Sequence, residues 1–317
     1  MFTYLLRRIC LLVFVLWGVS VLTFTLMYLL PGERARLVAI YRWGYDDLSA
    51  KELATLRREI GEDLPFPQQY AWWLGRVARG DLGYSFVTGR PVAAEILARV
   101  PATLELAVAA FFFAALTAVP LGIACARRPG SWWDNLLMTG SLIGVAMPNF
   151  WLGLLLILIF SLTLDLLPVA GSGGLAHLVL PAFTLGAGMA AVSTRLVRAS
   201  LLEVLAQDYI TMARTKGLGE GEVLWRHALR NALIPVFTVL GLQLNHLVGG
   251  TVIVENVFGR AGVGQLMVEA IASRDLPLLQ GVVLFLAFCF AGVNLLVDIS
   301  YTFLDPRIRY GGAKGNE

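Results

Sequence analysis

Long apolar runs separated by polar segments dominate this chain of 317 residues, and most of the runs reach the length of a membrane-spanning helix. Six runs can be recognised, at residues 9–30, 103–126, 136–164, 178–197, 233–254 and 278–303. A helix needs about 20 apolar residues to cross the hydrocarbon core of a bilayer. The pattern therefore predicts an all-α polytopic membrane protein with six transmembrane helices.

Two of the six runs are irregular. The third is long and contains Pro148, and the fourth is interrupted by Arg195 and Arg198. A broken third helix or a polar end on the fourth is tolerable where protein lines a cavity. The first run follows Arg7 and Arg8, as in a signal peptide, but it is longer than the apolar part of one and no small-residue cleavage site follows. We expect this run to stay in the protein as a helix.

Composition agrees with a lipid environment. The chain is 57% hydrophobic and only 15% charged, whereas about 25% of the residues of a soluble protein are charged. Its mean hydropathy is +0.72. Three cysteines form no CxxC pair, which argues against a disulfide framework. This composition predicts a lipid bilayer around the chain. The net charge is only +3 and no nucleic-acid signature is present, so no nucleic-acid partner is expected.

The distribution of positive charge predicts the orientation. With six helices, both termini lie on the same side of the membrane. Thirteen Lys and Arg residues fall on that side, against two, Arg260 and Arg274, in the short loops opposite. Cytoplasmic loops carry the excess of Lys and Arg, so both termini are expected in the cytoplasm. The segment 31–102 is too long for this rule and is expected outside.

The segment 31–102 is predicted to form a small external subdomain. Ser49 and Glu52 have the spacing of a capping box before an amphipathic pattern, which predicts a short helix. Aromatic residues at 70–73 indicate an interfacial element that returns to the bilayer surface. The alternative is a plain connector.

A second polar segment, at 201–219, is too polar for the membrane and too patterned for a simple loop. Two short helices fit it. The first is expected to end at Gly217, because glycine suits a left-handed cap and Lys216 then lies favourably at the helix C-terminus. The second is expected over 220–231, with Pro235 helping to start the fifth transmembrane helix. Such a protrusion can dock in a groove of a soluble partner and transmit its motion, and the alternative is a solvated loop.

Three motifs in this region carry a family resemblance. They are Asp208-Tyr209-Ile210, Ala213-Arg214-Thr215-Lys216-Gly217-Leu218 and His227-Ala228-Leu229-Arg230-Asn231-Ala232-Leu233-Ile234-Pro235. The region resembles the EAA loop of bacterial ABC importer permeases, in particular the dipeptide/oligopeptide/nickel transport family. Other similar motifs are Gly80-Asp81-Leu82-Gly83-Tyr84-Ser85, Met147-Pro148-Asn149-Phe150-Trp151, Ile253-Val254-Glu255 and Arg274-Asp275-Leu276-Pro277. The resemblance covers nearly the whole chain and is to the first of the two permease types. One departure is Arg260-Ala261, where Pro-Gly is usual.

The resemblance implies a permease subunit of an ATP-driven ABC importer in the bacterial cytoplasmic (inner) membrane, which forms the translocation path for di- or oligopeptides or a related small solute. Together with the apolar pattern, it divides the chain into a cytoplasmic N-terminus and first helix (1–30), an extracytoplasmic subdomain (31–102) and a five-helix permease core (103–317) with the EAA loop at about 201–232. The implied partners are a second homologous permease, two ATP-binding subunits and an extracytoplasmic solute-binding protein.

This chain is not expected to be an enzyme. It has no GxxxxGK[ST] segment, so ATP and Mg belong to the partner subunits and no cofactor is expected here. The residues that the resemblance implies in contact with the ATPase are Asp208, Tyr209, Ala213, Arg214, Lys216, Gly217 and Leu218.

Polar residues inside apolar runs are candidates for the translocation path, because burying them in lipid is costly. Asn245 and His246, with Gln243 nearby, lie in the fifth run, and Asn149 follows Pro148 in the third. The alternative for the fifth-run residues is a hydrogen bond between helices, and for Asn149 the satisfaction of carbonyls freed by the proline.

Nickel or a metal chelate is an alternative cargo. His177, His227 and His246 are expected at three different depths and cannot form one tight site, so an external binding protein would have to recognise the metal. We also considered a passive channel, a secondary carrier and an intramembrane hydrolase. The hydrolase requires a nucleophile and a base at membrane depth, whereas Ser172 lies in an external loop and His246 has no evident orienting acid.

Overall fold

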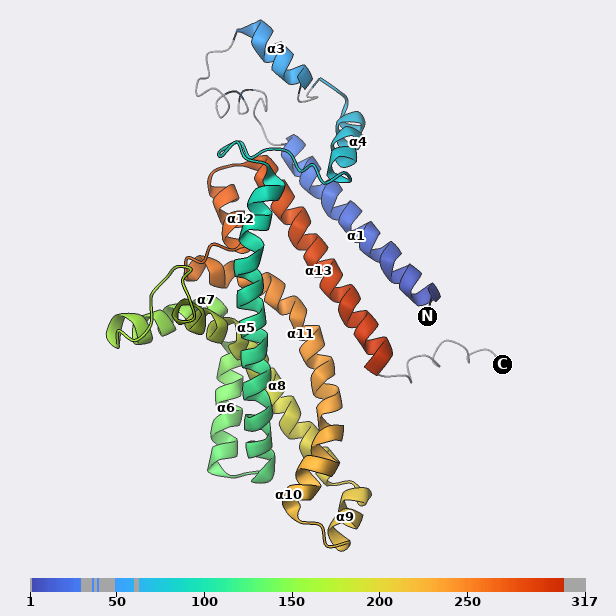
Figure 1. The fold of residues 1–317 in the computed structure, drawn as a ribbon, viewed down its shortest axis with the longest axis vertical. Helices are drawn as coiled ribbons and strands as arrows, with labels where there is room; N and C mark the ends of the chain where they lie inside the picture. The colour runs from blue at the N-terminus through green and yellow to red at the C-terminus, as the bar shows by residue number, and fades with distance from the viewer. Residues whose placement is uncertain (1, 30–35, 37–38, 40–48, 60–62, 305–317) are drawn as a thin grey trace. The chain divides into compact units, whose positions relative to one another are not determined.

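The computed structural model describes residues 2–29, 36, 39, 49–59 and 63–304, and in these residues every regular element is a helix (Figure 1). Five helices are long and apolar enough to cross a membrane, and a bent pair makes a sixth span if its two parts are counted as one. The prediction of an all-α polytopic protein is therefore confirmed.

In chain order the helices are α1 (Phe2–Leu29), α3 (Ala50–Glu59), α4 (Phe66–Val77), α5 (Val92–Arg127), α6 (Trp132–Ala146), α7 (Asn149–Leu156), the π-helical turn η1 (Ile157–Thr163), α8 (Ala176–Leu205), α9 (Asp208–Thr215), α10 (Glu220–Glu222), the π-helical turn η2 (Val223–Ala228), α11 (Leu229–Val257), α12 (Val263–Ala272) and α13 (Leu276–Leu304). The chain forms two compact units. Unit 1 comprises the described parts of 1–102 and 261–295, and unit 2 those of 103–260 and 296–317. Helices α5 and α13 contribute to both.

The capping box predicted in unit 1 is present at the start of α3. The backbone N–H of Ser49 donates to Glu52 Oε2 at 3.0 Å, and the N–H of Glu52 donates to Ser49 Oγ at 3.3 Å. The reciprocal bonds satisfy two amides that a helix start leaves without partners. Because the Ser49 hydroxyl and amide both bond its carboxylate, the pKa of Glu52 is lowered.

The predicted aromatic element is α4, which packs on α1. The rings of Tyr70 and Trp73 contact Phe24 of α1 at centroid distances of 5.4 and 5.3 Å, and the Tyr70 hydroxyl lies 2.7 Å from Ser20 Oγ. Trp72 is instead exposed. Two of the three aromatics at 70–73 therefore hold α4 against α1.

Helix α5 begins earlier than the apolar pattern predicted. It starts at Val92 rather than at 103, and Val92 and Ile96 are buried with Leu266 of α12 and Leu278 of α13. Polar residues such as Glu95 and Arg99 interrupt the first turns, so the apolar run starts only after them. Burial of one side of these turns, rather than uniform hydrophobicity, makes them helical.

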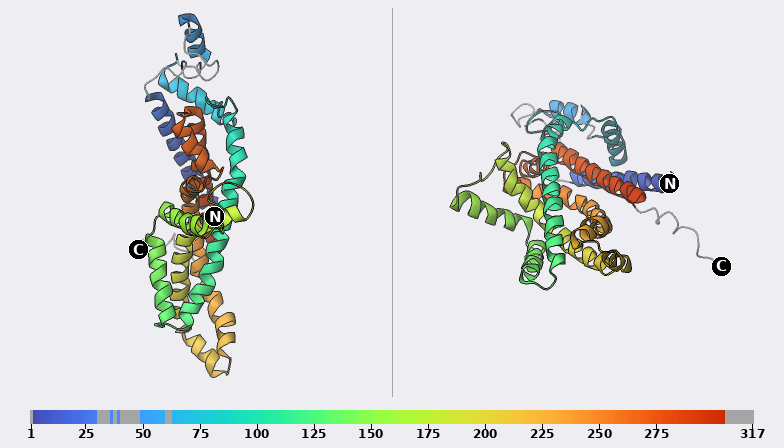
Figure 2. Two further views of the ribbon diagram at one scale, coloured as in Figure 1. Left: turned by 90° about the vertical axis from the view of Figure 1, so that its left-hand side faces the viewer. Right: turned by 60° about the horizontal axis from the view of Figure 1, so that its bottom comes forward.

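Unit 2 is built around α5, α8 and α11, which share two apolar clusters of buried residues. Figures 1 and 2 show α6 beside α5 and α8. Helices α5 and α8 approach closely at Gly186, where a Cβ atom would lie 2.6 Å from the carbonyl oxygen of Ala110. Small residues allow such contacts between membrane helices, where packing rather than a hydrophobic force drives association.

The third apolar run is broken at Pro148. Helices α6 and α7 with η1 are bent by 111° at this point. Met147 is extended, with φ −80° and ψ 122°, because the residue before a proline is driven out of the α-helical region. The break that Pro148 suggested is therefore present.

Helix α8 continues past the predicted end of the fourth run at 197, as far as Leu205. Arg195 and Arg198 lie inside the helix and do not end it. The charge of Arg198 is paired with Asp134 of α6 at 2.6 Å, so a cation here is compatible with a continuous helix.

Candidate functional site

The EAA loop contains a short helix, α9, at one end of unit 2 (Figures 1 and 2). It follows α8 after Ala206 and Gln207 and starts with Asp208, where the helix dipole favours an acidic side chain. The chain turns at Gly217, whose φ is +85°. No atom lies within 4 Å of a Cβ placed there, so glycine is required for this backbone conformation and not for space. The predicted glycine-terminated helix is confirmed.

The inner face of α9 packs against the rest of unit 2. Ile210 and Ala213 are buried in one cluster with Leu201 of α8 and Val223 of η2, and Leu218 packs against the same cluster. Ala213 therefore contacts this chain's own core. A larger side chain at 213 would first disturb the seat of α9.

The outer face of α9 is available to a partner. Asp208, Tyr209, Arg214 and Lys216 are exposed. Met212 is 60% exposed, and it is not among the residues predicted to contact the ATPase. Its spacing of three residues from Tyr209 places both on one helix face, a signal that could have identified a second, outward apolar stripe.

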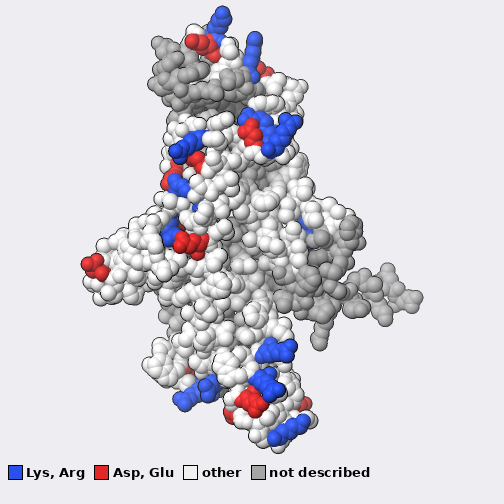
Figure 3. All heavy atoms as spheres, viewed as in Figure 1, with Lys and Arg blue, Asp and Glu red and all other residues white. Residues whose placement is uncertain are grey.

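Two side-chain contacts hold α9 in place. Arg214 donates from Nε and Nη2 to the two carboxylate oxygens of Glu220, at 2.8 and 3.2 Å. Asn231 Nδ2 donates to the Tyr209 hydroxyl at 2.9 Å. The Asn231–Tyr209 bond connects the third sequence motif of the EAA loop to the first, and the Arg214–Glu220 pair ties the second motif to the start of α10. Charged side chains gather at this end of unit 2, whereas the surface over the middle of its bundle is uncharged on the face drawn in Figure 3.

The predicted separate helix over 220–231 is wrong. Helix α10, the turn η2 and α11 follow one another directly, and Pro235 lies inside α11. A proline removes one backbone hydrogen bond from a helix. Ala232 and Val236, on either side of it, are fully buried, and their packing holds the helix through the proline. Continuous helix thus connects the EAA loop to the fifth span.

The candidate path residues lie in different surroundings. Gln243 is buried, and its Nε2 donates to Ser193 Oγ of α8 at 3.2 Å, which fits the interpretation of a bond between helices. His246 is exposed and Asn245 half-buried. Asn149 opens α7, and its Nδ2 would lie 3.5 Å from a Cβ atom at Gly250 of α11. A role of these four residues in translocation stays a prediction.

The far end of α11 carries a buried cation. Arg260 is 2% exposed. Its Nη2 donates to Glu105 Oε2 of α5 at 2.9 Å, and its Nη1 donates to the carbonyl of His177 at 3.2 Å. Next to it, the hydroxyl of Thr103 donates to the fully buried Glu255 at 2.6 Å. Arg260, the residue that departs from the family pattern, thus ties α5 at Glu105 and the start of α8 to the segment that follows α11.

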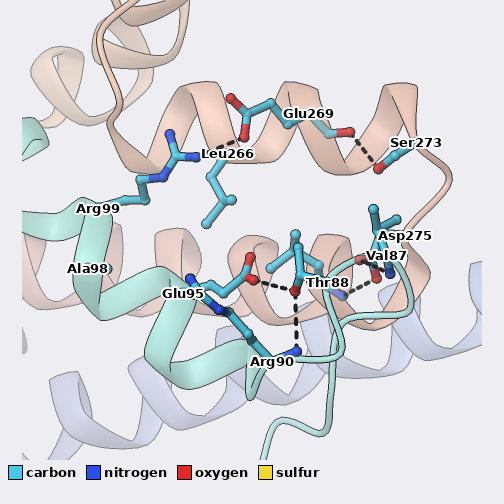
Figure 4. Close-up of a pocket in the computed structure, with 11 residues that line it drawn as sticks. Val87, Thr88, Arg90, Glu95, Ala98, Arg99, Leu266, Glu269, Ser273 and Asp275 are labelled. Atoms are coloured by element: carbon cyan, nitrogen blue, oxygen red, sulfur yellow. Dashed lines mark hydrogen bonds and ion pairs between the residues drawn. The ribbon is translucent and has the colours of Figure 1, made fainter. Parts of the chain in front are cut away.

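Unit 1 contains an open polar pocket of about 340 Å³ between α5, α12 and the loop before α5 (Figure 4). Arg99 pairs with Glu269 across it at 3.0 Å, and Thr88 bonds Glu95. At one end of the pocket, Asp275 accepts the hydroxyl of Ser85 and the backbone N–H groups of 86, 87 and 278. Two of the sequence motifs, around Ser85 and Asp275, therefore form one buried hydrogen-bond network.

Comparisons with known proteins agree along nearly the whole chain. Residues 118–310 match the model of the family described as binding-protein-dependent transport system inner membrane component, and residues 1–107 match the model of the N-terminal part of such proteins. A putative peptide transport system permease protein of Brucella abortus (strain 2308) is 41% identical over 314 residues, which cover 96% of this chain and 98% of that protein. The glutathione transport system permease protein of Escherichia coli (strain K12) is 40% identical over 310 residues, covering 98% of this chain and 100% of that protein.

Among solved structures, an inward-facing MetNI methionine ABC transporter matches with a TM-score of 0.53 and 20% identity over 66% of this chain and 96% of that one. This similarity supports the fold. Because the family models and the relatives match nearly end to end, this chain belongs to the family of binding-protein-dependent transport system inner membrane components.

Proposed function

We propose that this chain is a permease subunit of an ATP-driven ABC importer for short peptides, and that with a second homologous permease it forms the translocation path. The observation that carries the proposal is α9, a short helix whose inner face is fixed to α8 and η2 while its outer face is exposed. A channel that works without partner subunits does not need a docking helix of this kind.

The energy comes from partner subunits that bind ATP and Mg. They dock on the outer face of α9, where Tyr209 and Met212 offer apolar contacts beside the charges of Asp208 and Lys216. Nucleotide binds the two conformations of the ATPases with different affinity. This difference shifts the equilibrium between the inward-open and outward-open states of the permease. An external solute-binding protein delivers the cargo, in keeping with a family of binding-protein-dependent transport components.

The EAA loop faces the cytoplasm in this proposal. The support is the distribution of charge, since thirteen Lys and Arg residues lie on the side of the termini and the EAA loop, against two in the opposite short loops. Both termini are then cytoplasmic.

The cargo is a peptide-like solute. Relatives about 40% identical over almost the full chain are named for the transport of peptides and of glutathione, which favours a short peptide over nickel. Glutathione is itself a tripeptide, so both names point to the same chemical class.

Purification of the tagged chain from its native membrane tests the proposal. We expect a second permease and ATPases with Walker motifs in the purified complex, and ATP-dependent uptake of labelled glutathione or alanine dipeptide into vesicles. Met212→Glu places a charge on the outer face of α9 and leaves the packing of this chain intact. It should weaken recovery of the ATPases and uptake about tenfold or more, as expected for a residue at the centre of an interface.

Ala54→Glu, on the exposed face of α3, introduces the same charge elsewhere and should change neither quantity. A chain that is purified alone under conditions that preserve complexes, with no ATPase activity, would contradict the importer. Uptake of nickel but of neither peptide would contradict the cargo and leave the importer standing.

A further inference from the structure

An ion pair inside unit 2 joins α6 to α8. Arg198 donates from Nε and Nη2 to the two carboxylate oxygens of Asp134, at 2.6 and 2.7 Å. Asp134 is 1% exposed and also accepts the backbone N–H of Gly130 at 2.9 Å, while Ser131 caps α6 by accepting the N–H of Asp134 at 3.2 Å. The carboxylate is thus fixed both to the turn between α5 and α6 and to α8. A bidentate pair of this kind fixes orientation as well as distance.

Helix α6 packs along α8, and the ion pair adds a buried polar contact to this packing. The buried residues of α6 are both polar, Asp134 and Ser141. Ser141 bonds the carbonyl of Leu137 in its own helix. All residues of α6 are described, and none of them belongs to the apolar clusters that hold α5, α8, α9 and α11 together. The Asp134–Arg198 pair is therefore a polar link between α6 and α8 beside the packing of the two helices.

Arg198 is close to the EAA loop along the chain and in space. It lies about two helical turns before the end of α8 at Leu205, and α9 begins at Asp208. Val197, beside Arg198, is buried in the same cluster as Ile210 of α9. A displacement of α9 is therefore passed to this part of α8 through packed side chains, which behave as a solid rather than a fluid.

The other end of α6 leads to the bend at Pro148. Beyond the bend, Leu156 of α7 shares an apolar cluster with Val254 and Phe258 at the far end of α11. Helix α6 thus connects the end of unit 2 that carries α9 with the opposite end.

We propose that Asp134 and Arg198 are positioning residues for transport, and that their ion pair passes the displacement of α9 to α6 and the bent α6–α7 segment. The inference rests on the proposed function, because a partner must move α9. A contiguous network alone does not establish coupling, so the test must separate coupling from stability.

The test compares solute transported per ATP hydrolysed in the complex purified through this chain and reconstituted in vesicles. Labelled glutathione and labelled alanine dipeptide are the probes. Asp134→Asn should lower this ratio at least tenfold while the ATPase remains bound and active. Arg198→Lys keeps the charge but loses the bidentate geometry, and it should give an intermediate ratio. Arg195→Gln, on the exposed face of the preceding turn of α8, is the matched control and should leave the ratio unchanged.

The double variant Asp134→Asn with Arg198→Gln protects the test against misfolding. It leaves no unpaired buried charge, so the complex should recover stability and ATPase activity but not the transport ratio. Recovery of the ratio together with stability would assign the pair a structural role and overturn the proposal, as would an equal loss of transport and ATP hydrolysis in every variant. If the wild-type complex contains no ATPase, the proposed function fails first and this inference fails with it.

Discussion

Replacement of Gly186 by alanine tests the close contact between α5 and α8. A Cβ atom at this position would lie 2.6 Å from the carbonyl oxygen of Ala110 and 2.9 Å from Cδ1 of Phe113. The phenyl ring can rotate away. The carbonyl belongs to the backbone of α5, so the two helices must separate by several tenths of an ångström. Both helices belong to the same apolar cluster, and the separation loosens contacts along it.

The expected loss follows from two opposing terms. Overpacking in a tight core costs about 1–3 kcal/mol, and alanine in place of glycine inside a helix recovers about 1 kcal/mol. Because the obstacle is backbone, we expect a value near the upper end, with a net destabilisation of about 1–2 kcal/mol. Gly188 is the matched control, since it lies in the same helix and has no atom within 4 Å of the added Cβ. Gly188→Ala should stabilise by about 0.5–1 kcal/mol.

Thermal denaturation of the purified complex in detergent measures the difference. The shift per kcal/mol falls with chain length and is about 1–2 °C for a chain of 317 residues. The apparent melting temperatures of the two variants should therefore differ by roughly 2–5 °C, with Gly186→Ala the lower. Equal melting temperatures, or a higher value for Gly186→Ala, would refute the close approach of α5 and α8.

Three further predictions concern other sites. Gly217→Ala forces a residue with a side chain into a left-handed backbone conformation at a cost of about 1–2 kcal/mol. It should therefore reduce the recovery of the ATPase with the tagged chain more than Gly217→Asn does, because asparagine tolerates this conformation. Equal recovery would contradict the role of the positive φ at this turn. Glu105→Ala leaves the buried Arg260 without the carboxylate of Glu105 and should lower the free energy of unfolding by about 3 kcal/mol. Arg260→Met should cost less, because the carboxylate that it leaves is half-exposed and can be hydrated. A lower melting temperature for Arg260→Met than for Glu105→Ala would contradict this. Asp275→Asn presents an amide to groups that donate hydrogen bonds and should cost about 1–3 kcal/mol of stability; an unchanged melting temperature would show that the network contributes little.

Local physics allowed the spans and the break between α6 and α7 to be predicted from the sequence. An apolar run of sufficient length specifies a spanning helix, and Pro148 restricts the residue before it whatever the surroundings. The same local reasoning failed at Pro235. There the burial of Ala232 and Val236, which depends on the tertiary structure, outweighs the tendency of proline to end a helix.

The pairs of charged residues could not be predicted from the sequence, because their partners are far apart along the chain. Asp134 and Arg198 are 64 residues apart, and Glu105 and Arg260 are 155 apart. In the sequence, Arg198 indicated only the polar end of a span. Arg260 indicated only a departure from a family pattern. Only the fold shows that each has an acidic partner. The exposed outer face of α9 was accessible to sequence reasoning, whereas the burial of Ala213 was not.

The division into units has a consequence for synthesis of the chain. Unit 1 combines residues from 1–102 with residues from 261–295, so its apolar cluster cannot close until Val263 to Val282, in the last fifth of the chain, have left the ribosome. At about 5–20 residues per second, roughly 10–30 s pass between the two parts. During this interval Val92 and Ile96 lack the partners that α12 and α13 later supply. The insertion machinery or a chaperone must shield these residues, and truncation of the chain before α12 should convert it into a substrate for membrane proteases.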